Sequence, residues 1–158
     1  MPKVLICYYS RSGNTKAMAY MIADGIRLSD VDVDVKKVVD VKPADLLKYD
    51  GLVFGSPTYY GVCAAEIKSL IDKSVKYHGK LCCKVGGAFA SSANVGGGNE
   101  TTVLQLLQAF LIHGMVIIGD SEGDHYGPVS IEKPNRRVEK DCKDYGKKIA
   151  WLVKKLAE

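Results

Sequence analysis

The stretch CYYSRSGNTKAMA, residues 7–19, gives the clearest indication of the fold, because in it a polar loop joins an apolar run to a helical pattern. The run KVLICY, residues 3–8, has the length and composition of a buried strand, and residues 14–28 place apolar side chains at helical spacing. The first N–H groups of such a helix lack partners, and the helix dipole favours an anion beside them. The loop is therefore expected to hold an anion.

The same alternation of apolar strands and amphipathic helices continues along the chain. Further strands are predicted at residues 32–38, 51–55, 84–90 and 115–119, and helices at 64–77, 100–113 and 136–157, with a short helical turn at 43–48. Segment 32–38 alternates Val with Asp and Lys, which is typical of an edge strand. The pattern predicts an α/β fold with a doubly wound, five-stranded parallel sheet, whose ligand lies beyond the carboxyl ends of the strands.

Composition predicts one globular domain, residues 1–158, with 47% hydrophobic and 25% charged residues. The N-terminus has no signal-peptide pattern and no apolar run reaches membrane length, so we expect a cytoplasmic protein without membrane insertion. The charge of +4 is mild and dispersed, which disfavours a nucleic-acid partner. The five cysteines include no C-x-x-C pair, which indicates reduced thiols and no metal site.

Several known phosphate-binding motifs do not match the first loop. A Walker A loop needs a second glycine and a lysine, and a dinucleotide fingerprint needs three glycines, whereas Gly13 is the only glycine here. A cysteine-dependent phosphatase would need an arginine at the position of Gly13, and a receiver domain would need acidic residues after the first strand. The loop instead offers hydroxyls and an amide to one terminal phosphate, or these side chains simply cap the helix.

Three segments resemble the flavodoxin family. SRSGNT, residues 10–15, is similar to the loop in which flavodoxins hold the phosphate of flavin mononucleotide (FMN). Residues 49–72 (YDGLVFGSPTYYGVCAAEIKSLID) and 91–119 (SSANVGGGNETTVLQLLQAFLIHGMVIIG) resemble the WrbA-like, NAD(P)H:quinone oxidoreductase branch. The resemblance implies a flavodoxin-like three-layer sandwich with strand order 2-1-3-4-5 and FMN as the cofactor.

The resemblance also implies which residues contact FMN. The phosphate would be surrounded by Ser10, Arg11, Ser12, Gly13, Asn14 and Thr15. The isoalloxazine would lie between Pro57, Thr58, Tyr59, Tyr60 and Gly61 on one side and Ser92, Ala93, Asn94, Val95, Gly96 and Gly97 on the other. His113 matches a histidine that reaches the flavin in the WrbA-like branch from a neighbouring subunit, although it can also serve as a helix C-cap.

Two functions follow from the resemblance. In the first, the protein is an FMN electron carrier that serves redox partner proteins. In the second, it is an NAD(P)H-dependent quinone oxidoreductase, and the resemblance of segments 49–72 and 91–119 favours this function. The protein could then form a homo-oligomer. The predicted helix at 64–77 leads directly into the strand at 84–90, without the extra segments of the WrbA-like enzymes, and this favours the carrier.

Overall fold

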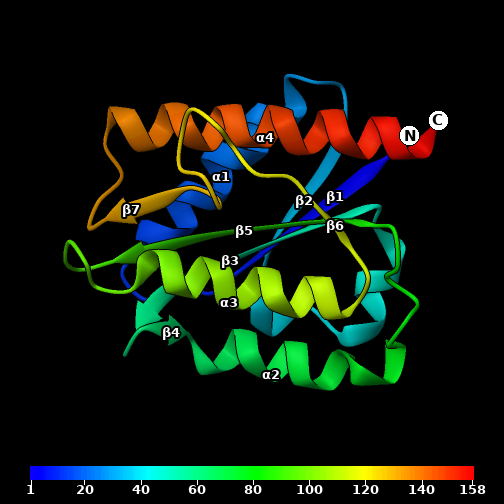
Figure 1. The fold of residues 1–158 in the computed structure, drawn as a ribbon, viewed down its shortest axis with the longest axis horizontal. Coiled ribbons are helices and arrows are strands. Elements are labelled where there is room, and N and C mark those ends of the chain that lie inside the picture. The colour runs from blue at the N-terminus through cyan, green and yellow to red at the C-terminus, as the bar shows by residue number, and fades with distance from the viewer.

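A computed structural model describes residues 1–158 as a parallel β-sheet with helices on both faces (Figure 1). The sheet order is β2-β1-β3-β5-β6, with β7 also paired to β5 and the short β4 antiparallel to β3. Its strands are β1 (Lys3–Tyr8), β2 (Asp32–Lys37), β3 (Gly51–Tyr59), β4 (Val62–Cys63), β5 (Val85–Ser92), β6 (Val116–Ile117) and β7 (Val129–Ile131). The predicted doubly wound parallel fold is confirmed, and β2 lies at the sheet edge as its alternating pattern indicates.

The helices cover the sheet in two layers. The α-helices are α1 (Asn14–Arg27), α2 (Ala65–Lys73), α3 (Asn99–Ile112) and α4 (Arg136–Ala157), and the 3-10 helices are η1 (Val38–Asp40), η2 (Pro43–Lys48) and η3 (Ser74–Tyr77). Figure 1 shows α1 and α4 on one face of the sheet and α2 and α3 on the other. No helix is long and apolar enough to cross a membrane.

Three predicted boundaries are wrong. Strand β3 continues past residue 55 to Tyr59, because its end still pairs with β5, with Pro57 opposite Ser91. The helix predicted at 64–77 is α-helical only to Lys73 and then tightens into η3. The strand predicted at 115–119 is reduced to β6, and β7 pairs beside the far end of β5 after a long loop.

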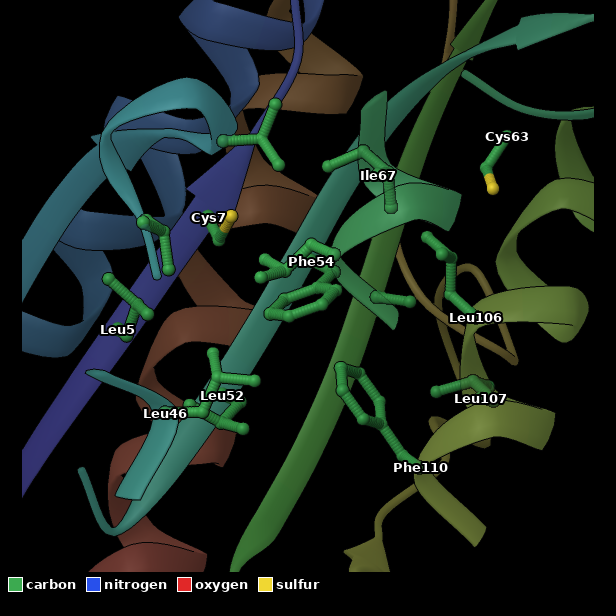
Figure 2. Close-up of a cluster of buried hydrophobic side chains, with 14 of the residues drawn as sticks. Leu5, Cys7, Leu46, Leu52, Phe54, Cys63, Ile67, Leu106, Leu107 and Phe110 are labelled. Carbon is green, nitrogen blue, oxygen red and sulfur yellow. The ribbon is translucent and has the colours of Figure 1, made fainter. Parts of the chain in front are cut away.

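Each face of the sheet has its own hydrophobic core. In the core beneath α2 and α3, Phe54 of β3 meets Phe110 of α3 edge to face, with ring centroids 4.9 Å apart. Figure 2 shows these rings together with Leu52, Leu106 and the buried Cys7. Because β1, β3 and β5 are buried on both faces, their carboxyl ends are held in fixed positions relative to one another.

On the other face, α1 and α4 cross in backbone contact. A Cβ atom added to Gly25 would lie 2.0 Å from the carbonyl oxygen of Lys143, and one added to Gly146 would lie 2.2 Å from that of Ile22. Only glycine allows such an approach. The contact fixes α1, and therefore the loop that precedes it, against the rest of the domain.

Candidate functional site

A cavity of about 440 Å3 opens at the carboxyl ends of β1, β3 and β5, where the doubly wound topology predicts a ligand. Its walls come from four separate segments of the chain. The residues that line it are Arg11, Ser12, Asn14, Thr15, Pro57, Thr58, Tyr59, Ser91, Ser92, Ala93 and Glu132. The fold thus brings the first loop together with the ends of β3 and β5.

The first loop presents unused hydrogen-bond donors to this cavity and to a neighbouring cavity of about 380 Å3, which Gly13 and Lys16 line. Gly13 is the N-cap of α1 with φ of +100°, no side chain caps the helix, and a Cβ on Gly13 would meet only open space. The backbone N–H groups of Asn14, Thr15 and Lys16 have no acceptor in the protein. The only side chain that accepts from the loop backbone is Ser10, whose Oγ receives the N–H of Gly13 at 3.1 Å. The helix start therefore has the donors and the space for an anion.

The floor of the cavity contains two buried threonine hydroxyls. Thr15 Oγ1 and Ser91 Oγ are 2.8 Å apart and buried, so this hydrogen bond ties the start of α1 to the end of β5. Thr58 Oγ1 is buried but has no hydrogen-bond partner. Because an unpaired buried hydroxyl is costly, Thr58 is a polar atom that a ligand in the cavity could satisfy.

Aromatic side chains stand at the end of β3. Tyr59 packs edge to face on Tyr9 with ring centroids 6.3 Å apart, and its pKa is raised by burial and by Tyr9, while Arg11 opposes the rise. Tyr60 is fully exposed. With φ of 50° at Tyr60 and 81° at Gly61, both residues are left-handed and form the tight turn between β3 and β4. Flat rings beside a polar cavity can stack on a planar ligand.

The glycine-rich loop after β5 touches this turn. A Cβ on Gly98 would lie 2.8 Å from the Cα of Gly61, and Thr101 donates a hydrogen bond from Oγ1 to the carbonyl of Gly61 at 3.0 Å. Within the loop, Ser92 Oγ and the N–H of Gly97 both donate to the carbonyl of Asn94, at 3.1 Å each. The exposed members of the loop are Ala93, Asn94, Val95, Gly96 and Gly97. These two loops therefore form one continuous rim.

His113 lies away from this site. It is the C-cap of α3, whose 14 residues extend about 21 Å from the glycine-rich loop toward the opposite end of the sheet. Its Nε2 pairs with Ser74 Oγ at 2.8 Å, and its buried Nδ1 has no partner. Burial and, less strongly, His78 lower its pKa. Within its own chain His113 does not reach the cavity, because α3 runs away from it, and the expected contact with a flavin of a neighbouring subunit stays a prediction.

Two cavity residues are absent from the flavin contacts that the resemblance implies, Ser91 and Glu132. Ser91 immediately follows the fourth predicted strand, so its place beside the strand end was available from the pattern. Glu132 gives no such signal, because it reaches the cavity only through β7. Its N–H donates to the carbonyl of Ser92 at 2.7 Å, and its φ is 55°.

The fold and the site define a class: doubly wound α/β proteins whose ligand site lies at the carboxyl ends of the strands. Residues 6–110 match the family model described as flavodoxin, and the chain belongs to this family. The resemblance deduced from the three segments is thus confirmed. Membership implies a flavin cofactor.

Three similar relatives carry two different names. An NAD(P)H dehydrogenase (quinone) of Sinorhizobium fredii is 37% identical over 141 residues, covering 75% of this chain and 71% of the relative. A protein of the same name from Archaeoglobus fulgidus is 30% identical over 190 positions, covering 99% of this chain and 100% of the relative. A flavodoxin of Aquifex aeolicus is 36% identical over 163 positions, covering 97% and 88%.

Solved structures agree with the fold. A flavodoxin from the domain Archaea superposes with a TM-score of 0.80 at 30% identity, covering 96% of this chain and 99% of the other. A WrbA-like flavodoxin from Agrobacterium tumefaciens superposes with a TM-score of 0.81 at 24% identity, covering 98% and 99%.

Proposed function

We propose that this protein binds FMN in the cavity at the ends of β1, β3 and β5 and transfers electrons through it. The observation that carries the proposal is the start of α1, where the N–H groups of Asn14, Thr15 and Lys16 lack acceptors beside open space at Gly13. A terminal phosphate would satisfy these donors. Bound FMN supplies both hydride and single-electron chemistry, and the protein supplies binding and orientation.

Each part of the cavity has a role in this proposal. The loop of residues 10–15 would hold the phosphate, and the unpaired hydroxyl of Thr58 would donate to the cofactor. Tyr59 and Tyr60, at the end of β3, would contact one side of the isoalloxazine. The loop of residues 92–97 would approach its other side with backbone N–H groups, because glycines leave no side chain between backbone and ring.

A phosphate test separates this proposal from plain helix capping. Ser12 lines the cavity and its hydroxyl has no partner in the protein, so Ser12→Ala removes one donor without breaking an internal bond. A hydrogen bond to a charged group is worth about 1.5–3 kcal/mol, which corresponds to roughly a 10- to 150-fold weaker FMN Kd. Riboflavin lacks the phosphate, and its Kd should not change.

Flavin fluorescence titration of the apoprotein measures both constants. The matched control is Ser29→Ala, at the other end of the same helix, where the hydroxyl donates to the carbonyl of Gly25. This variant should keep the parent affinity for both ligands. Equal FMN and riboflavin affinities in the parent protein would show that the loop holds no phosphate and would overturn the assignment.

A second function, NAD(P)H-dependent quinone reduction, is supported by the relatives that carry this name. Two observations favour the electron carrier instead. The alignment with the Archaeoglobus fulgidus relative spans 190 positions, whereas this chain has 158 residues, so that relative contains segments that this chain lacks. Between η3 and β5 the chain has only a short turn, residues 78–84.

Anaerobic mixing decides between the two functions. The FMN-loaded protein is combined with NADH or NADPH, and the absorbance band of the oxidised flavin is followed. A carrier keeps this band, and its electrons must come from a partner protein. Bleaching within seconds, followed by turnover with a benzoquinone, would establish the oxidoreductase and remove the pure carrier.

The setting of this activity also belongs to the proposal. We place the protein in the cytoplasm as one FMN-binding domain, residues 1–158, with redox partner proteins as the exchange partners of the carrier. In the second function, NAD(P)H is the electron donor and a quinone is the electron acceptor. Cell fractionation with an antibody to the chain tests the location.

A further inference from the structure

A pair of adjacent cysteines lies outside the flavin site. Cys82 and Cys83 are both exposed, and their Sγ atoms are 3.6 Å apart. They lie just before β5, at the opposite end of this strand from the cavity, and a strand of 8 residues spans about 26 Å. The pair is therefore independent of any bound flavin.

The backbone holds this pair in place. The N–H of Cys83 donates to the carbonyl of Gly114 at 3.0 Å, and the N–H of Lys84 donates to the carbonyl of Leu81 at 3.1 Å. Cys83 is left-handed, with φ of 65°, and the buried side chain of Leu81 anchors the turn in the core. A Cβ on Gly114 would lie 3.2 Å from the Sγ of Cys82, so this glycine makes room for the sulfur.

The remaining cysteines are buried and unreactive. Burial raises the pKa of Cys7 to about 12 and also raises the pKa values of Cys63 and Cys142. The hydrogen bond with Cys82 also raises the pKa of Cys83, so accessibility separates the two groups: the three buried thiols react slowly in the folded protein, whereas Cys82 and Cys83 are exposed to reagents. The native chain is thus expected to present two accessible thiols, which form one close pair.

The spacing of the pair suits a bridging atom better than a disulfide. Adjacent Cα atoms are about 3.8 Å apart, below the usual range of about 4.4–6.8 Å for disulfides. We consider one atom that bridges the two sulfurs, which lie 3.6 Å apart, through bonds of about 2.3 Å, the length of a zinc–thiolate bond. The angle between the two bonds at this atom is then about 100°. A pyramidal trivalent arsenic accepts this angle. The two sulfurs alone fall short of the tetrahedral ligand set of zinc, and no group of three potential ligands is present.

We propose that Cys82 and Cys83 form a bidentate binding site for trivalent arsenicals of the organoarsenous class. With phenylarsine oxide, the arsenic–oxygen double bond and two S–H bonds break and two arsenic–sulfur bonds form. Both protons leave with the oxygen as water. Arsenic stays trivalent and the sulfurs are not oxidised, so no co-reactant is needed.

Bidentate attachment predicts a distinctive stability. Once one sulfur is bound, the second is already beside the arsenic, and such linkage strengthens binding by about 100-fold or more without new contacts. The adduct is therefore expected to survive an excess of glutathione, a monothiol, and to be released by 2,3-dimercaptopropanol, a dithiol that competes through the same advantage.

The experiment counts maleimide-reactive thiols by intact mass. The native chain should show two reactive thiols, and one equivalent of phenylarsine oxide should protect both of them from maleimide. Their reactivity should return after addition of dimercaptopropanol but not after addition of glutathione. Cys82→Ser and Cys83→Ser should each keep one reactive thiol and release the arsenical to glutathione. The matched control is Lys154→Cys in the Cys82→Ser/Cys83→Ser background, which has one isolated exposed thiol. This thiol should also release the arsenical to glutathione.

Three results would overturn the site. Release of phenylarsine oxide from the native chain by glutathione would show attachment through single thiols. Glutathione-resistant binding in either single-cysteine variant would assign the arsenical to other residues. Absence of maleimide-reactive thiols before the arsenical is added, with their appearance after reduction, would show a disulfide in place of the open pair.

Discussion

Replacing Tyr60 by asparagine should stabilise the protein and weaken FMN binding at the same time. Tyr60 occupies the first left-handed position of the turn between β3 and β4, with φ of 50°, and Gly61 occupies the second. A left-handed backbone costs most residues about 1–2 kcal/mol, whereas asparagine tolerates it and Asn-Gly is the preferred sequence for such a turn. The ring of Tyr60 is fully exposed, so its removal takes no packing from the apoprotein.

The relief of backbone strain is expected to reach about 1 kcal/mol, which raises Tm by roughly 2–4 °C for a chain of this size. The loss of an aromatic partner for the isoalloxazine has the opposite sign. Stacking contributes about 0.5–1.5 kcal/mol beyond buried area, which corresponds to roughly a 2- to 10-fold weaker FMN Kd. Stability without flavin and affinity for flavin should therefore move in opposite directions.

Thermal unfolding of the apoprotein and fluorescence titration with FMN measure the two effects. The control is Tyr60→Phe, which keeps both the ring and the strained backbone and should change neither quantity. An unchanged or lower Tm in Tyr60→Asn would refute the strain argument. A raised Tm with an unchanged Kd would show that Tyr60 does not contact the flavin.

Gly146→Ala should lower the free energy of unfolding, measured in urea, by about 1–3 kcal/mol, because the added Cβ would lie 2.2 Å from a carbonyl oxygen of α1. This clash outweighs the better helix propensity of alanine. Equal stability of the variant and the parent protein would mean that the two helices do not touch. Tyr145→Phe should cost about 1–3 kcal/mol in the same assay, since the buried N–H of Ala88 donates to its hydroxyl at 3.1 Å and would lose its partner. The pKa of Asp120 is lowered to about 2, and the largest cause is the hydrogen bond that its carboxylate accepts from the N–H of Glu122. The ionised carboxylate therefore contributes to the folding stability above about pH 4, and this contribution is lost as the pH falls toward 2. Asp120→Asn should therefore reduce the loss of stability measured by urea unfolding across that interval, and an unchanged pH profile would contradict this assignment.

The buried strands and the first loop could be predicted because their signals are local. Strand β1 is an apolar run, and the glycine in SRSGNT stands where α1 needs a left-handed residue. The extension of β3 to Tyr59 could not be predicted, since a proline followed by polar residues normally indicates a turn. Pro57 is accommodated because it stands near the end of the strand, where it pairs with Ser91.

The last strand shows why tertiary pairing cannot be recovered from an apolar pattern. The run MVIIG at 115–119 has the composition of a full strand, yet only Val116 and Ile117 pair with β5. The far half of that edge is taken by β7, whose three residues are too short to give a periodic signal. Glu132 follows β7 directly, so its place in the cavity depends on this long-range pairing and has no counterpart in local sequence.

His113 shows how a residue matched by resemblance can depend on assembly. In its own chain it ends α3 at the far edge of the sheet and is held by Ser74, so it cannot reach the cavity of that chain without breaking a buried hydrogen bond. Any contact of His113 with a flavin must therefore involve a second copy of the protein. If sedimentation shows a monomer, His113→Ala should leave the FMN Kd unchanged and lower only the stability, because Ser74 Oγ would lose one of its two hydrogen bonds and keep the one to the carbonyl of Ile71.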